Sequence, residues 1–135
     1  MILYREFGTE LLEQVMSLYG KEGWDLYTTY PRKVKPAWER SIYRLGAFEG
    51  EQLIGFIRCT GDGEFDAYVS DLLVDPTYRR QGVVRKLMQR AMEHFKDVDT
   101  FALMTGLEQL ENHVFYRSLG MHEYANNHLI GFLRP

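Results

Sequence analysis

Residues 72–90 constrain the fold most, because the period of the hydrophobic pattern changes along them. An apolar run ends at Val74, and the following Asp75-Pro76 interrupts a strand, since proline has no N–H to donate. After a basic turn that contains Gly82, apolar residues recur at the spacing of a half-buried helix: Val84, Leu87, Met88, Ala91 and Phe95. The stretch therefore predicts a strand, a turn and a helix over residues 83–95.

The turn of this unit is predicted to bind phosphate. Four cations surround it, although the chain as a whole has a net charge of −3: Arg79, Arg80, Arg85 and Lys86. The first N–H groups of a helix have no intrahelical partner, and the positive end of the helix dipole lies beside them. Positive charge around an open helix start favours a bound phosphate group.

The basic turn also resembles a known motif. The run that begins at Val74, V-D-P-T-Y-R-R-Q-G-V-V, is similar to the acyl-CoA-binding motif of the GNAT superfamily of N-acyltransferases, Q/R-x-x-G-x-G/A after a strand and a short turn. Arg79 matches the first position of that motif and Gly82 the second. Val84 departs from it, because a branched side chain stands where the family mostly has Gly or Ala.

A second motif follows in the order that the family has. Residues 112–123, N-H-V-F-Y-R-S-L-G-M-H-E, resemble the family's N-x-x-F-Y-x-x-L-G-F. The resemblance covers about residues 53–123, and it identifies the chain as a member of the superfamily.

The resemblance implies acetyl-CoA as co-substrate and a set of residues that hold it. In the family the fourth and fifth strands splay apart, and the pantetheine arm enters the gap and pairs with the backbone of the fourth strand. The implied CoA-binding residues are Leu73, Val74, Arg79, Arg80, Gln81, Gly82, Val83, Val84, Arg85, Asn112 and Tyr116.

The hydrophobic patterns predict an α/β (α+β) fold in one domain, residues 1–135, with helices on the faces of a mixed, mostly antiparallel sheet. Asp62-Gly63 predicts a hairpin within three consecutive antiparallel strands. The expected strands are residues 2–7, 45–48, 52–60, about 64–74 and 100–104, with one or two more between 121 and 133. Besides the helix over 83–95, we expect helices around 11–19, at 36–44 and at 109–119.

Tyr116 is predicted to be the catalytic acid. The family's acid matches this position, where a phenol would protonate the thiolate that leaves. The alternative is a core aromatic, since Tyr116 belongs to a helix whose Val114 and Leu119 are expected to be buried.

Asp71 is predicted to be the general base, directly or through an ordered water. It interrupts a strand end that is apolar on both faces, and we place it on the same face as Val69 and Leu73. Burial raises a carboxyl pKa and suits it to base catalysis near neutrality. A structural carboxylate held by backbone donors at a bulge is the alternative, and Glu64 and Asp66 are rivals for the base.

Residues 20–31, here called the aromatic loop, are predicted to bind the acceptor. Trp24, Tyr27 and Tyr30 lie within seven residues of this Gly- and Pro-containing segment, and such a loop is rarely mere connection. The family commonly lines its acceptor site with the corresponding segment. The alternatives are the core of a lid and a surface for a partner protein.

The composition also bears on nucleic-acid binding, disulfides, membrane spans and metal sites. The net charge of −3 argues against a general nucleic-acid binder. Cys59 is the one cysteine, which excludes an internal disulfide and fits a reducing cytoplasm. No apolar run approaches the ~20 residues of a membrane span. The four histidines show no spacing typical of a metal site, so no metal is expected.

The sequence therefore predicts a cytoplasmic N-acetyltransferase that moves an acetyl group from acetyl-CoA to a primary amine of a small molecule or peptide by direct attack. The alternatives are a catalytically silent acyl-CoA binding or sensing module and an interaction protein that uses the aromatic loop. The identity of the amine and the oligomeric state stay open, a homodimer included.

Overall fold

The structure is a computed structural model that describes all residues from 1 to 135. The chain divides into two compact units, Met1–Leu103 and Met104–Pro135, and each is described by itself. The single domain expected over residues 1–135 stays a prediction.

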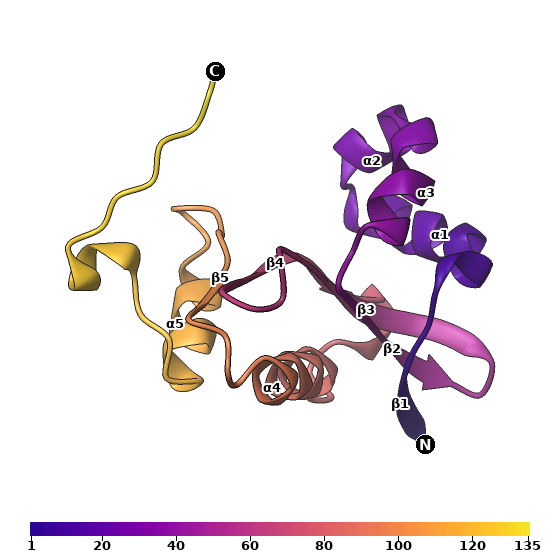
Figure 1. Cartoon of the computed structure of the whole chain (residues 1–135). Helices are drawn as coiled ribbons and strands as arrows, with labels where there is room; N and C mark the ends of the chain where they lie inside the picture. The colour runs from indigo at the N-terminus through magenta and orange to yellow at the C-terminus, as the bar shows by residue number, and fades with distance from the viewer. The chain divides into compact units, whose positions relative to one another are not determined.

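A five-stranded sheet is the frame of the first unit (Figure 1). Its strands lie side by side in chain order, and each neighbouring pair is antiparallel except β4 and β5, which are parallel. The predicted mixed, mostly antiparallel sheet is confirmed. The strands are β1 (Ile2–Glu6), β2 (Tyr43–Glu49), β3 (Gln52–Thr60), β4 (Asp66–Val74) and β5 (Thr100–Ala102).

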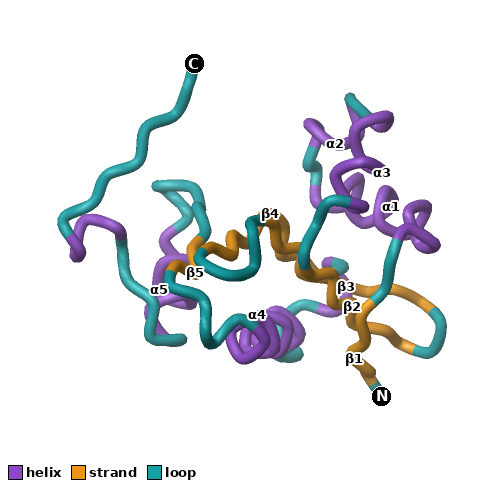
Figure 2. The backbone as a smooth tube through the Cα atoms, in the orientation of Figure 1, coloured by secondary structure: helices purple, strands orange, loops and turns teal.

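Helices cover both faces of this sheet. Helices α1 (Leu12–Glu22), α2 (Asp25–Thr29) and α3 (Pro31–Glu39) gather on one face, and α4 (Val83–His94) lies on the other (Figures 1 and 2). Helix α1 packs against β3 and β4, and α4 packs against β2, β3 and β4. Burial from both sides explains why β3 is an almost continuous apolar run.

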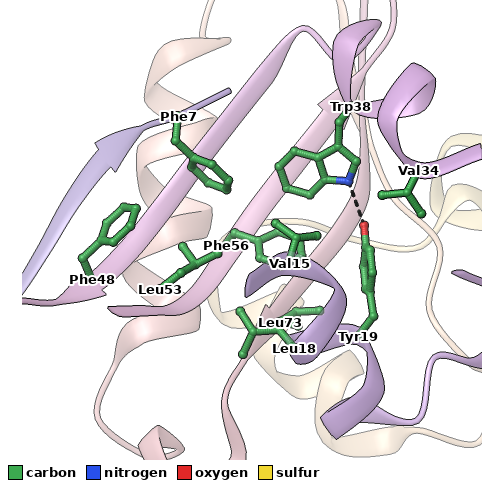
Figure 3. Packing of buried hydrophobic residues seen from close by; sticks show 10 residues of the cluster. All are labelled: Phe7, Val15, Leu18, Tyr19, Val34, Trp38, Phe48, Leu53, Phe56 and Leu73. Carbon is green, nitrogen blue, oxygen red and sulfur yellow. Dashed lines mark hydrogen bonds between the residues drawn. The ribbon is translucent and has the colours of Figure 1, made fainter. Parts of the chain in front are cut away.

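The face under α1 and α3 holds an aromatic core (Figure 3). Tyr19 of α1 is fully buried and Trp38 of α3 is 1% exposed. The indole Nε1 of Trp38 donates a hydrogen bond to the Tyr19 hydroxyl at 3.1 Å, so the two helices are joined inside the core. The buried members are Phe7, Val15, Leu18, Tyr19, Val34, Trp38, Phe48, Leu53, Phe56 and Leu73.

The helices before β2 differ from the prediction. Helix α3 begins at Pro31 and ends at Glu39, five residues before the predicted end at 44, and it contains Pro36. Either proline suits a first turn, where its missing N–H costs nothing. Pro31 starts the helix, and Pro36 lies in its interior, where the missing N–H removes one helical hydrogen bond. Helix α2 was not predicted, because five residues are too few to show a helical period.

The second unit contains α5 (Leu110–Ser118) and a 3₁₀ turn at Tyr124–Asn127. The chain leaves α5 through Gly120, whose φ of 89° confirms the predicted left-handed helix end. The strands predicted between residues 121 and 133 are wrong, since none forms there. A strand needs a neighbour for its backbone groups, and the apolar side chains after the turn stay exposed: Leu129, Ile130, Phe132 and Leu133.

The close approach of β3 to β4 at Gly55 predicts how a larger residue there changes the stability of the protein. A Cβ added at Gly55 would lie 2.8 Å from the Leu73 carbonyl oxygen and 3.2 Å from the Cα of Val74. Gly55→Ala should therefore lower the free energy of unfolding by about 1–3 kcal/mol, the usual cost of overpacking. Urea denaturation measures this, with Gly20→Ala as the control.

Gly20 lies in α1, and a Cβ there would meet nothing within 4 Å. Gly20→Ala should raise the free energy of unfolding by about 0.5–1 kcal/mol, because alanine favours the helix. A Gly55→Ala protein as stable as the parent would show that β3 and β4 are not so tightly apposed.

Candidate active site

The turn between β4 and α4 forms an open helix start. Gly82 is the N-cap residue of α4 and has a φ of 77°, and no side chain caps this helix. A Cβ at Gly82 would meet nothing within 4 Å, so the left-handed backbone, not a lack of space, favours glycine here. Arg80 also has a positive φ, 65°. The uncapped first turn of α4 fits the phosphate group that the sequence predicts.

The cations of the turn are in different surroundings. Arg79 forms an ion pair with Glu22 at the end of α1, with 2.9 Å between Nη2 and Oε1, and its side chain stays 58% exposed. The Glu22 side chain is only 17% exposed, so the pair is partly shielded from solvent. The side chains of Arg80, Arg85 and Lys86 are exposed, whereas Val84 is half-buried in the first turn of α4. The turn thus keeps exposed positive charge beside the helix start.

A second ion pair ties the end of α1 to this turn. The carboxylate of Asp75 is buried and accepts hydrogen bonds from Lys21 Nζ at 2.7 Å and from the N–H and hydroxyl of Thr77 at 2.9 and 2.8 Å. The bond from Lys21, followed by the bonds from Thr77, holds the pKa of Asp75 below its usual range. The Asp75-Pro76 strand break is therefore also an anchor for the turn between β4 and α4, residues 75–82, here called the phosphate turn after its predicted ligand.

Strands β4 and β5 diverge beside the turn. They pair only through residues 66–68 of β4 and 100–102 of β5. Farther along β4, Leu73 and Val74 pair with Phe56 and Gly55 on the β3 side alone. The divergence matches the splayed fourth and fifth strands that the resemblance implies, and it leaves a free strand edge that fits an extended pantetheine arm.

Asp71 lies at the centre of a buried polar network. Its Oδ2 atom accepts hydrogen bonds from Arg58 Nε and from the Tyr19 hydroxyl, and its Oδ1 atom accepts one from the Tyr27 hydroxyl, each at 2.5 Å. Asp71 is 1% exposed and Arg58 is 5% exposed. Arg58 also reaches the Ser41 hydroxyl with Nη1 at 3.2 Å. The carboxylate thus has a buried counter-ion and a donor on each oxygen.

A bulge in β4 sets the direction of Asp71. The pairing register shifts between Arg58, which lies opposite Asp71, and Cys59, which lies opposite Val69, so Ser70 is the extra residue. Opposed residues share a face and successive residues alternate. Asp71 therefore points with Arg58 toward α1, while Val69 points to the opposite face, which corrects the shared face expected from the sequence.

These contacts argue that Asp71 does not act as the general base. A base must reach the proton that it removes, and the Asp71 side chain is inaccessible, with both oxygens engaged. Its surroundings correspond to the structural alternative, except that side chains and not backbone groups are the donors. The rivals Glu64 and Asp66 are exposed at the β3–β4 connection, where the Asp62 carboxylate accepts their N–H groups at 2.8 and 3.0 Å.

The aromatic loop packs partly onto this network. Tyr27 stacks on Tyr19 with ring centroids 4.1 Å apart and an interplanar angle of 12°, and Trp24 stacks on the same tyrosine at 6.0 Å. Burial, followed by the charge of Asp71, raises the pKa of Tyr27 to about 12. Tyr30 is exposed, with Lys33 Nζ 5.0 Å from its ring centroid. The structure thus joins Tyr27 to Asp71 but leaves Tyr30 apart from them.

Tyr116 and Asn112 belong to α5 in the second unit. Tyr116 is half-buried beside Phe115, and burial raises the pKa of its phenol above the ordinary value. Asn112 Nδ2 donates to Thr105 Oγ1 and to Gln109 Oε1, both at 3.1 Å. The phenol of Tyr116 is therefore protonated at neutral pH, as an acid must be.

The sequence reasoning missed the partners of Asp71. Arg58 is a charged residue within the apolar run of β3, just as Asp71 is a charged residue within the apolar end of β4. A buried charge needs an opposite charge nearby, so the two anomalies in consecutive strands could have been paired.

The chain belongs to the GNAT acetyltransferase family. The sequence model described as "Acetyltransferase (GNAT) family" matches residues 10–121, which include most of this chain. The resemblance drawn from the two motifs is confirmed.

Two relatives match about half of the chain. An uncharacterised N-acetyltransferase of Prochlorococcus marinus is 34% identical over 70 residues, 49% of this chain and 39% of that protein. The "Histone acetyltransferase TAP1" of Glycine max is 35% identical over 74 residues, 53% of this chain and 31% of that protein. The chain thus spans well under half the length of either relative.

Solved structures share the fold along the whole chain. A GNAT-family acetyltransferase from Streptococcus pneumoniae has a TM-score of 0.88 at 31% identity, covering 100% of this chain and 98% of that one. AAC(6')-Iy, in complex with a bisubstrate analog that carries CoA, has a TM-score of 0.71 at 19% identity with coverages of 100% and 98%, and shows the fold alone.

No helix has the length and apolar character needed to cross a bilayer. No three or more His, Cys, Asp or Glu side chains are placed to hold a metal ion together.

Proposed function

We propose that this protein transfers an acetyl group from acetyl-CoA to a primary amine. The observation that carries the proposal is the uncapped start of α4 beside the diverging edge of β4, in a chain of the GNAT family. An uncapped helix start suits a pyrophosphate, and a free strand edge suits an extended amide-containing arm.

Each part of the site has a role in this proposal. The backbone of residues 80–85 holds the pyrophosphate, with Arg79 and Arg80 as counter-charges, and the edge of β4 at Leu73 and Val74 pairs with the arm. Bound acetyl-CoA supplies the acetyl group as a thioester. The amine nitrogen forms a bond to the acetyl carbon as the carbon–sulfur bond breaks. The amine attacks in its neutral form, so an amine that binds protonated first gives one proton to water, and its nitrogen gives up a second proton to water as the amide forms. Tyr116 donates its proton to the leaving sulfur and is reprotonated from water.

The acceptor is proposed to be a cationic amine that contacts the aromatic loop. A ring face of Trp24 or Tyr30 would contribute ~0.5–2 kcal/mol to binding a charged amine. One relative is named a histone acetyltransferase, and one structural neighbour is an aminoglycoside acetyltransferase. Both names refer to acceptors that carry basic amines. The cytoplasm is the proposed location on the ground of the single cysteine, although some relatives are named chloroplastic.

The alternative is an acyl-CoA-binding module without turnover. Two observations favour it: Val84 replaces the small residue of the CoA motif, and the buried Asp71 offers no accessible base. Release of free CoA thiol in the presence of acetyl-CoA and a panel of primary amines decides between the two. We expect turnover with at least one amine. Binding of CoA without any turnover would select the module.

The phosphate turn can be tested by reversing its charge. Arg79→Glu with Arg80→Glu should weaken CoA binding about tenfold or more, because two attractive charges become repulsive, and added salt should reduce the difference. Calorimetric titration with CoA measures it. The matched control is Lys35→Glu in α3 with Arg40→Glu at the C-cap of that helix, the same charge change at two exposed residues. Unchanged affinity in the turn variant would place the CoA site elsewhere.

Tyr116→Phe should lower kcat by about 10–100-fold. A thiolate is a good leaving group, so its protonation helps less than a typical general acid does. The ring stays in place, so the melting temperature should change little. Tyr124→Phe is the control, since it removes the other phenol of the second unit beyond the end of α5. A stable Tyr116→Phe protein with unchanged kcat would show that Tyr116 only packs.

A further inference from the structure

The Asp71 carboxylate of β4 is bonded to the aromatic loop through the Tyr27 side chain. Of its three donors, Arg58 and Tyr19 are buried in the first unit, whereas Tyr27 comes from the loop and is half-buried. The Tyr27 hydroxyl also accepts a hydrogen bond from Arg58 Nη2 at 3.3 Å. Both members of the buried ion pair thus hold the same phenol oxygen.

Tyr27 is the residue of α2 that contacts the core. It has five residues, far fewer than an isolated helix needs for stability. Tyr27 is the one residue of α2 that is not exposed, while its neighbours face solvent: Asp25, Leu26, Thr28 and Thr29. Within α2 itself, the contacts with the core are therefore the Tyr27 hydroxyl bonds and the stack of the Tyr27 ring against Tyr19, and Trp24 at the N-cap adds a second stack on Tyr19.

The ends of α2 carry the two other aromatic residues of the candidate acceptor surface. Trp24 is the N-cap residue of the helix and Tyr30 is its C-cap residue. Anything that fixes α2 therefore fixes the starting points of both side chains. A rotation of α2 would move them together.

We propose that Asp71, with Arg58, is a positioning residue for acceptor binding. By holding the Tyr27 hydroxyl, the ion pair fixes α2 and so orders the surface formed by Trp24, Tyr27 and Tyr30. This rests on the proposed acetyltransferase function for the identity of the ligand, but the ordering of α2 is a property of the free protein. Asp71 takes no proton from the amine in this role.

The experiment compares two hydroxyl deletions on α2. Tyr27→Phe removes the oxygen and keeps the ring stack, so the fold should survive. Thr29→Val removes an exposed hydroxyl from the same helix and keeps the side-chain shape. Amide hydrogen exchange of residues 24–30 is measured in the free protein, and KM is measured for the acetylated amine and for acetyl-CoA.

Tyr27→Phe should speed exchange of residues 24–30 by about tenfold or more, the usual effect of losing a hydrogen bond to a charged group. The KM for the amine should rise by about the same factor, while kcat and the KM for acetyl-CoA stay within about twofold. Thr29→Val should match the parent protein in every measurement. Exchange in Tyr27→Phe equal to that in Thr29→Val would overturn the proposal, as would equal increases in both KM values.

Variants of the ion pair complete the test. Asp71→Asn should speed exchange of residues 24–30, and adding Tyr27→Phe should bring little further change, because coupled residues are not additive. If Asp71→Asn does not fold, Arg58→Lys replaces it, since lysine keeps the charge but lacks the fork that spans Asp71 and Tyr27. Independent, additive effects of the two changes would overturn the proposal. Fast exchange in Tyr27→Phe without turnover of any amine would support the ordering of α2 and defeat only the acetyltransferase function.

Discussion

The ion pair between Asp71 and Arg58 is the interaction on which the helical face of the first unit depends. Removing charged groups from water costs several kcal/mol each, and attraction offsets this only where the remaining polar atoms are also satisfied. Tyr19 from α1, Tyr27 from α2 and Ser41 beyond α3 supply the remaining bonds. No buried side-chain nitrogen or oxygen of the protein lacks a hydrogen-bond partner. Helices α1 and α2 and the residue Ser41, which follows α3, are thus held around one pair of charges.

The bulge at Ser70 makes this arrangement possible, and the sequence conceals it. A two-residue turn at Asp62-Gly63 would place Arg58 opposite Ala67 in β4. In the structure the connection is longer and Ser70 is an extra residue, so Arg58 lies opposite Asp71. Register decides which side chains meet. Local residue types showed two unusual charges in apolar strands, but they could not show that the charges were partners.

The geometry of the turn between β4 and α4 was easier to predict than that of the aromatic loop, for a physical reason. The turn has an uncapped helix start and a left-handed Gly82, and a local motif specifies both features. The strand–turn–helix unit and the mixed sheet follow from patterns within short windows. The aromatic loop gave no comparable signal, because α2 is stabilised by Tyr27 and its contact with Asp71, 44 residues away. The prediction of closing strands between residues 121 and 133 was wrong for a similar reason, since apolar residues alone do not provide a neighbouring strand to pair with.

The choice of an ion pair at this position favours a role in positioning over one in stability. Apolar side chains of similar volume often stabilise a core as well as a buried ion pair does, but they cannot hold a hydroxyl at a fixed point. Burial and the charge of Asp71 raise the pKa of Tyr27 to about 12, so the phenol keeps its proton at neutral pH. The Arg58 guanidinium keeps its charge, since the hydrogen bond and charge of Asp71 outweigh burial and raise its pKa. Asp71 therefore remains the acceptor and Tyr27 the donor, and the direction of this bond fixes α2 relative to the sheet of the first unit.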